Sequence, residues 1–175
     1  TFQLAAPDAC APVVGCWTNL PPDQRAGHPS LAHYVASKAR IFQNQTAADV
    51  AVVNAEDDVV MQAGRGVAAR AVSFGIDAGD AHVVDGHLVG PQGEDLGAIA
   101  DMVRPFPHEL TNGLAAACAA MAVGVAAATC ATVLREFAGL PHRIQLVGHI
   151  GDVACFDDSK ATTPASVVTA LYAFP

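Results

Sequence analysis

Basic side chains are scarce in this sequence of 175 residues. Lysine and arginine together number nine, against 17 aspartates and glutamates, and the formal net charge is −8. Nucleic-acid binding draws most of its affinity from clustered lysine and arginine. The composition therefore argues against a nucleic-acid partner. It also draws attention to the two lysines of the chain, Lys38 and Lys160.

Motifs for zinc binding and for hydrolysis are missing as well. The five cysteines are odd in number and scattered, without the CxxC spacing of zinc and redox sites. The seven histidines form no HExxH pattern, and no Ser-His-Asp set stands out. We therefore expect a protein of the reducing cytoplasm without a recognisable zinc or hydrolase site.

Long, strongly hydrophobic runs are absent, with one stretch to be weighed. Residues 114–134 carry no charge and are long enough to cross a bilayer. Nearly half of them are alanines, which contribute far less transfer free energy than leucine or isoleucine, and Gly124 interrupts the run. We predict two short packed helices here rather than a membrane span.

The apolar segments that are present predict an α/β fold. Hydrophobic residues make up 52% of the chain, enough for one sizeable core or for one domain and a piece of another. Residues 11–20 and 49–58 have the pattern of buried strands, and between them Ser30 is a candidate helix N-cap. Acidic residues end the second strand, where parallel sheets often present ligand-binding groups.

The second half of the chain changes its periodicity twice. Short strands with turn signals, among them Asp85-Gly86, predict a small antiparallel insert within residues 70–104. After the two helices, Gly151-Asp152 indicates a hairpin and Pro164 the first turn of a closing helix. We place a domain boundary near Leu140, which divides the chain into residues 1–139 and 140–175.

Lys38 occupies an unexpected position on the helix that follows Ser30. Helical spacing places it within an apolar face that comprises Leu31, Tyr34, Val35, Lys38, Ile41 and Phe42, with His33, Ser37 and Arg40 opposite. Either its stem lies along the core while the ammonium reaches water, or the lysine is paired or chemically altered, since an unpaired buried charge is costly.

A polar cluster, CFDDSKATTP at residues 155–164, lies between the hairpin and the closing helix. Such a loop either caps the helix at Pro164 or binds anionic groups through its lysine and hydroxyls. Residue chemistry alone leaves both interpretations open.

Five motifs in one order give the chain a family resemblance. They are FQL (2–4), ASKARIF (36–42), VVNAEDD (52–58), GLPHR (139–143) and DDSKAT (157–162). In this order and approximate spacing they resemble the Mur ligases, and within them the branch that adds D-glutamate in peptidoglycan synthesis. The resemblance covers essentially the whole chain.

This resemblance implies a fragment of an ATP- and Mg²⁺-dependent amide ligase of the cytoplasm. Such an enzyme phosphorylates the carboxylate of UDP-N-acetylmuramoyl-L-alanine to an acyl phosphate, which the amine of D-glutamate attacks. Residues 1–139 would be a partial central ATP-binding domain with a parallel sheet. Residues 140–175 would begin a Rossmann-like C-terminal domain that binds the amino acid. The glycine-rich phosphate loop and the UDP-sugar domain would lie before Thr1, and the chain alone is expected to be inactive.

The resemblance also implies roles for individual residues. Lys38 matches the catalytic lysine whose carbamate faces magnesium, and Asn112 matches an adenine contact. Arg143 and Asp158 match residues of the ATP site, with Arg143 also counted as catalytic. Lys160, the third catalytic candidate, and Thr162 match the pair that together binds the substrate D-glutamate.

Four positions depart from the family pattern. Ala5 and Gln24 stand where the family has its metal-binding glutamate and histidine, Glu109 follows His108 in place of an asparagine, and Thr163 replaces another asparagine. A magnesium site that loses a carboxylate and an imidazole keeps only the lysine-derived anion. The alternative function is therefore a degenerate, non-catalytic Mur-like domain that serves as a scaffold or binding piece, and we expect Lys38 to be unmodified.

Overall fold

The computed structural model describes residues 4, 9–20 and 28–174, and its fold is α/β, as the sequence predicts. The elements in chain order are β1 (Val14–Trp17), α2 (Leu31–Ala39), the 3-10 helix η1 (Arg40–Phe42), β2 (Val50–Asn54), α3 (Asp58–Gly64), β3 (Arg70–Phe74), β4 (His82–Val84), β5 (His87–Val89), β6 (Asp95–Ala98), the 3-10 helix η2 (Ile99–Asp101), α4 (Pro107–Ala122), α5 (Ala127–Glu136), β7 (Gln145–Ile150), β8 (Val153–Asp157) and α6 (Pro164–Leu171).

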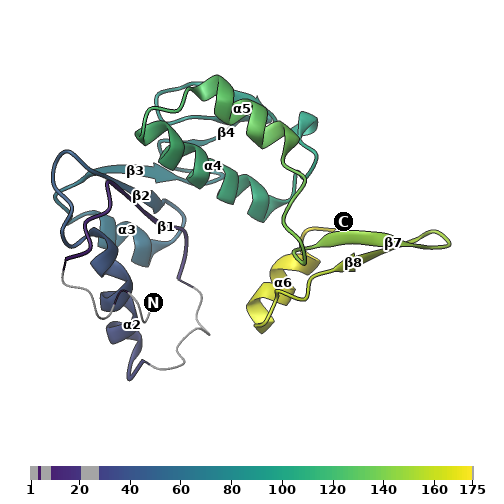
Figure 1. The fold of residues 1–175 in the computed structure, drawn as a ribbon, viewed down its shortest axis with the longest axis horizontal. Helices are drawn as coiled ribbons and strands as arrows, with labels where there is room; N and C mark the ends of the chain where they lie inside the picture. The colour runs from purple at the N-terminus through teal and green to yellow at the C-terminus, as the bar shows by residue number, and fades with distance from the viewer. Residues whose placement is uncertain (1–3, 5–8, 21–27, 175) are drawn as a thin grey trace.

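A three-stranded parallel sheet forms the centre of the molecule. Its order is β1-β2-β3, and all five residues of β2 are buried. Val50 and Val52 belong to a core shared with α4, whereas Ala51 and Val53 belong to a second core on the other face. Figure 1 shows α2 and α3 on one face of the sheet and α4 on the other. A strand covered on both faces explains the unbroken apolar run of β2.

The helix after Ser30 begins where the sequence predicts, but its buried face differs. The Ser30 hydroxyl accepts a hydrogen bond from the His33 amide, a standard N-cap. Ser37 was expected on the polar face and is instead buried, which is possible because its hydroxyl donates to the His33 carbonyl at 2.8 Å. Leu31, expected on the apolar face, is 40% exposed.

The antiparallel insert is smaller than the range predicted for it. Arg70–Phe74 is β3, which pairs with β2 in the parallel sheet and precedes the insert. The separate sheet β4-β5-β6 follows. Asp85 and Gly86, with φ of 49° and 78°, form its first turn, as expected for a two-residue hairpin with both central residues in the left-handed region.

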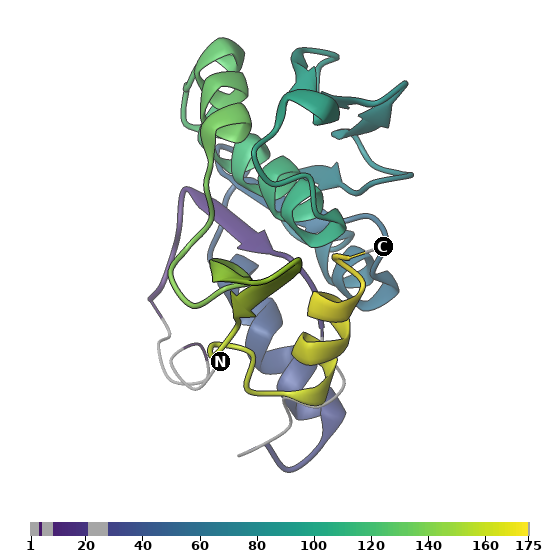
Figure 2. The same cartoon turned by 90° about the vertical axis from the view of Figure 1, so that its right-hand side faces the viewer.

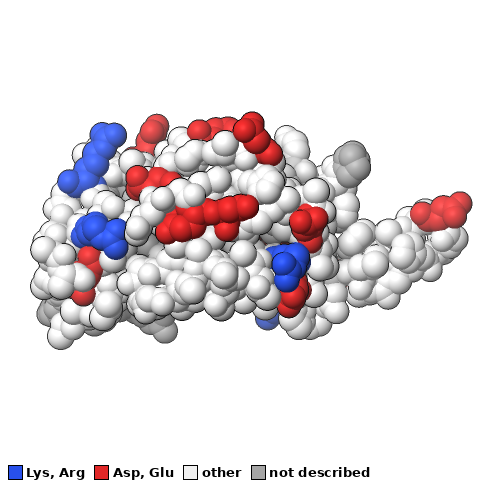
Figure 3. Space-filling model, turned by 90° about the horizontal axis from the view of Figure 1, so that it is seen from above, with Lys and Arg blue, Asp and Glu red and all other residues white. Residues whose placement is uncertain are grey.

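The alanine-rich run forms the two packed helices predicted for it, α4 and α5, with Gly124 at φ 91° between them. Within residues 4, 9–20 and 28–174, no helix combines the length and hydropathy that crossing a bilayer requires. Acidic side chains outweigh basic ones on the face in Figure 3, in keeping with the net charge of −8.

The last part of the chain forms a hairpin and a helix beside the parallel sheet rather than within it. β7 and β8 pair only with each other among the described strands, and α6 begins at Pro164 with Thr163 as its N-cap. Figures 1 and 2 show this unit at the end of α4. The domain boundary near Leu140 remains a prediction.

Candidate functional site

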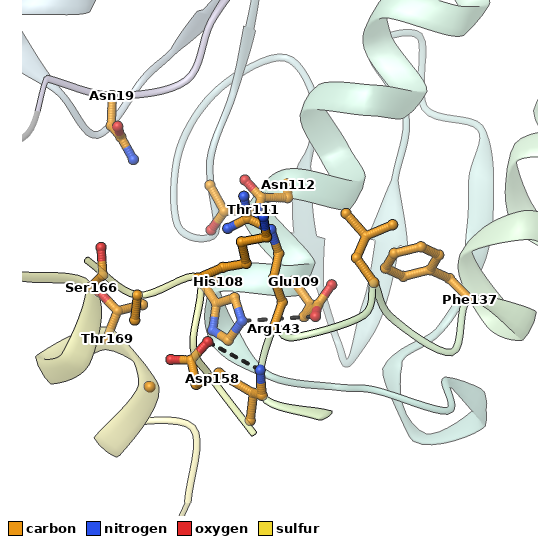
Figure 4. Close-up of a pocket in the computed structure, with 15 residues that line it drawn as sticks. Asn19, His108, Glu109, Thr111, Asn112, Phe137, Arg143, Asp158, Ser166 and Thr169 are labelled. Carbon is orange, nitrogen blue, oxygen red and sulfur yellow. Dashed lines mark hydrogen bonds and ion pairs between the residues drawn. The ribbon is translucent and has the colours of Figure 1, made fainter. Parts of the chain in front are cut away.

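A cleft of about 590 Å³ lies where the first turns of α4 meet the connection from α5 to β7 and the segment that leads into α6. Four residues singled out by the family resemblance line it: Asn112, Arg143, Asp158 and Lys160. In Figure 4 the labelled side chains of α4 face those of α6 across this space. The fold thus brings together residues that lie up to 48 positions apart, from 112 to 160.

Two of the sequence motifs form one structure at the floor of the cleft. The main-chain amide of Ile144 donates to Asp158 Oδ1 at 3.2 Å, and the amide of Lys160 donates to the His142 carbonyl at 3.2 Å. A third bond joins His142 Nδ1 and Asp157 Oδ2 at 2.7 Å. The GLPHR and DDSKAT segments are therefore held by each other, which fixes the backbone of Arg143 and Lys160.

This arrangement requires unusual backbone angles. His142 and Ile144 have φ of 62° and 47°, in the left-handed region that disfavours residues with a Cβ, and most of all a β-branched one. Each such residue costs of order 1–3 kcal/mol and persists where its surroundings enforce it. Here the hydrogen bonds between the two motifs hold His142 and Ile144 in these conformations.

Arg104 is a buried cation beside residues that line the cleft, and no sequence motif singled it out. It is 9% exposed, and its Nε and Nη2 donate to Glu109 Oε1 at 3.0 and 2.9 Å. Its Nη1 donates to the Ile144 carbonyl at 2.9 Å and Nη2 to the Arg143 carbonyl at 3.1 Å. The charge is thus paired, and each of the three guanidinium nitrogens donates at least one hydrogen bond, as burial of this group requires.

His108 contributes an uncharged ring to the cleft at neutral pH. Burial is the main cause that lowers its pKa from the ordinary 6.5; Arg104 lowers it further, while Glu109 and Asp158 oppose the shift. The ring stacks on Phe106 with 5.9 Å between centroids. An imidazole that lines the cleft and stacks on a phenyl ring suits contact with another ring system.

Asp157 differs from its neighbour Asp158 in what it binds. The hydrogen bond with His142 is the largest cause, followed by the Ser159 amide, that lowers the pKa of Asp157 from 3.8 to about 2. Both carboxylates of the cluster therefore take part in loop structure, because Asp158 also accepts from Ile144. The structural interpretation of the cluster thus holds for its two carboxylates, and ligand binding by Lys160 and the hydroxyls remains a prediction.

The acids that follow β2 hold loops together. Glu56 Oε1 accepts hydrogen bonds from the amides of Ile76 and Asp77, each at 2.7 Å. Asp57 caps α3 and accepts from the Leu20 amide at 2.8 Å. These carboxylates lie at the expected end of the strand, but their contacts are structural; one of them fixes the loop that presents Asn19 to the cleft.

Lys38 and Thr162 do not line this cleft. The Lys38 ammonium lies 5.2 Å from the ring centroid of Tyr34 and 5.9 Å from that of Trp17, within reach of a cation–π interaction. The two rings explain how a lysine is accommodated on the inner face of α2.

The donor set suits ATP better than it suits Mg²⁺. Ala5 and Gln24, which replace the metal ligands of the family, lie outside the described residues. In the described part of the chain no three His, Cys, Asp or Glu side chains gather as a metal site, and Lys38 faces rings rather than oxygen ligands. The cleft, in contrast, offers a guanidinium, an ammonium and an amide, groups that bind phosphate and nucleobase edges.

Comparison with known proteins identifies the family. The model of the Mur ligase middle domain matches residues 3–120, and the chain belongs to the Mur ligase family. Relatives named UDP-N-acetylmuramoylalanine--D-glutamate ligase share 37% identity in Geobacillus kaustophilus and 36% in Desulfosudis oleivorans, each over 99% of this chain. The predicted resemblance to this branch is thereby confirmed. The chain spans 39% of the length of either relative.

Solved structures agree on the fold. MurF from Acinetobacter baumannii superposes with a TM-score of 0.73 at 21% identity, over 90% of this chain and 36% of that one. UDP-N-acetylmuramate-alanine ligase MurC from Thermotoga maritima gives 0.70 at 22% identity, over 93% of this chain and 38% of its own.

Proposed function

We propose that the chain is part of an ATP-dependent ligase that adds D-glutamate to UDP-N-acetylmuramoyl-L-alanine in the cytoplasm. Residues 1–139 would supply much of the central ATP-binding domain, and residues 140–175 the start of the amino-acid-binding domain. The observation that carries the proposal is the cleft in which Asn112 meets Arg143, Asp158 and Lys160. The identity of about 36% with the named relatives supports it.

Each cleft residue has a chemistry that fits its proposed ligand. The Asn112 amide both donates and accepts, as an adenine edge requires, and the Arg143 guanidinium pairs with phosphate oxygens. Asp158 uses Oδ1 for the Ile144 amide, which leaves Oδ2 for a ribose hydroxyl. Lys160, together with Thr162, would hold the carboxylates of D-glutamate.

In the whole enzyme the substrate carboxylate takes the terminal phosphoryl group of ATP, and ADP leaves. The D-glutamate amine then attacks the acyl phosphate, an amide forms, and inorganic phosphate and a proton are released. The residues of this chain would bind and orient these anions, with Arg143 and Lys160 placed to offset their negative charge. When bound, magnesium would supply further charge neutralisation at the phosphates.

A second candidate function rests on Ala5 and Gln24. With neither metal ligand of the family pattern, the protein would be a degenerate Mur-like domain that binds a nucleotide or a partner without catalysis. The coding sequence before Thr1 discriminates the two. A glycine-rich GKT or GKS loop there supports the ligase, and a natural start without such a loop supports the degenerate domain.

The nucleotide cleft can be tested on the chain itself. Its 175 residues contain no glycine-rich phosphate loop, so we expect no ligation and only weak binding of ATP, roughly millimolar. In an NMR titration with ATP, the amides of Asn112, Arg143 and Lys160 should shift. Asn112→Ala should weaken binding, whereas Gln62→Ala, an exposed amide on α3, should not. Shifts that avoid the cleft would overturn the assignment, and micromolar affinity in calorimetry would contradict the expected weak binding.

A further inference from the structure

The link between the central sheet domain and the C-terminal hairpin runs through main-chain atoms. Arg104, which precedes α4, donates to the carbonyl oxygens of both Arg143 and Ile144. The peptide bond between Arg143 and Ile144 is held at both ends, because its carbonyl accepts from Arg104 and its amide donates to Asp158. Hydrogen bonds therefore hold both the carbonyl and the amide of Ile144. This fixes the backbone from which the Arg143 side chain extends into the cleft.

The residues around Arg104 hold its guanidinium in the orientation that reaches these two carbonyls. Phe106 covers the guanidinium, with 4.8 Å from Cζ to the ring centroid, and Glu109 Oε1 accepts hydrogen bonds from two of its nitrogens. A Cβ built on Gly139, whose φ is 93°, would lie 2.7 Å from Arg104 Nε. The chain thus passes over the guanidinium at a distance that only glycine permits.

We propose that Arg104 is a positioning residue for nucleotide binding: by holding the carbonyls of Arg143 and Ile144 it sets the Arg143 guanidinium in the cleft. This rests on the proposed function, since ATP is taken as the ligand of that cleft. Glu109 accepts hydrogen bonds from Arg104 and so orients this arginine rather than the adenine base. The position where the family pattern has an asparagine thus supports the connection between the two parts of the chain.

Lysine is the informative substitution. Arg104→Lys keeps the charge beside Glu109 but loses the planar fork that reaches two carbonyls at once. We expect the amides of Ile144 and Lys160, which this turn protects, to exchange with solvent about tenfold faster in NMR-detected hydrogen exchange. Arg135→Lys is the matched control, because Arg135 is exposed and pairs only with its neighbour Glu136 among the ion pairs described.

Affinity separates positioning from mere stabilisation. With Arg143 displaced, ATP should bind about tenfold more weakly to Arg104→Lys, whereas adenosine, which has no phosphates, should bind as it does to the unaltered chain. Equal losses for ATP and adenosine would overturn positioning and leave a structural role. Unchanged exchange at Ile144 and Lys160 would overturn the connection itself.

The exchange and affinity measurements together also distinguish this proposal from the proposed function. If the unaltered chain binds neither ATP nor adenosine, the nucleotide cleft fails and the positioning role for ATP fails with it. Faster exchange in Arg104→Lys would still establish the hold on the turn. If the unaltered chain binds ATP and Arg104→Lys binds it equally well, the cleft stands and only the positioning role is refuted.

Discussion

Arg104 and Glu109 form a nearly buried ion pair, with side chains 10% and 13% exposed and a shortest nitrogen–oxygen distance of 2.9 Å. Both residues flank the start of α4, five positions apart. The pair therefore fixes the entry of that helix while the remaining donors of Arg104 reach the turn before β7.

Removing the carboxylate of this pair should be more damaging than removing both charges. Glu109→Met leaves the buried guanidinium without its counter-charge and should lower the free energy of unfolding by about 3 kcal/mol. The double variant with Arg104→Met should recover part of that loss. Urea denaturation measures both, with the exposed pair member Glu136→Met expected within about 0.5 kcal/mol of the unaltered chain. A double variant less stable than Glu109→Met would contradict this.

Gly139 and Gly124 form a matched pair for testing close packing. Their φ values are 93° and 91°, but a Cβ at Gly139 meets Arg104, whereas one at Gly124 meets nothing within 4 Å. Alanine should cost about 1 kcal/mol at Gly124, from the backbone alone. At Gly139 it should cost about 2–3 kcal/mol, because the guanidinium must also move. Equal losses in thermal unfolding would show that Arg104 adapts freely.

The bond between His142 and Asp157 predicts a pH dependence of stability. Since the pKa of Asp157 is lowered from 3.8 to about 2, the folded state favours the carboxylate. The stabilisation is present above pH 3.8 and is lost as the pH falls through about 2. Asp157→Asn should lower the melting temperature at pH 6 and should converge with the unaltered chain near pH 2. A difference that stays constant over this range would contradict the assignment.

Lys38 should carry no carbamate. Its ammonium has two ring faces as neighbours, and the positions of the family's metal ligands hold Ala5 and Gln24, so little remains to stabilise a carbamate anion. Carbon-13 NMR under labelled bicarbonate should show no carbamate signal that Lys38→Met removes. A stable signal that depends on Lys38 would prove the prediction wrong. Restoring Ala5→Glu and Gln24→His in a full-length protein should recover magnesium dependence, which Lys38→Ala should then abolish.

Features governed by local chemistry were predictable from the sequence. Ser30 caps its helix, Asp85-Gly86 turns its hairpin and Pro164 starts the last helix because each depends on a few neighbouring residues. The alanine-rich run divides at Gly124 for the same reason.

Features that depend on distant contacts were not predictable. Arg104 acquires its role from carbonyls 39 and 40 positions away, and no residue type beside it announces them. Ser37 is buried because a main-chain carbonyl satisfies its hydroxyl, which a helical wheel does not take into account. The acids after β2 are ambiguous in sequence, since caps and ligands use the same carboxylates. Only the family resemblance led us to expect Asn112 and Asp158 in one site, which the cleft brings together.

The hold of Arg104 on carbonyl oxygens separates two requirements at position 143. Every amino acid carries the same carbonyl, so an exchange of the Arg143 side chain leaves this attachment in place. Substitutions there would therefore change the side chain that the proposed ligand meets without removing the joint between the two parts of the chain. Under the proposed function, a loss of ligand binding at position 143 and a loss of this joint at Arg104 or Gly139 are separate effects.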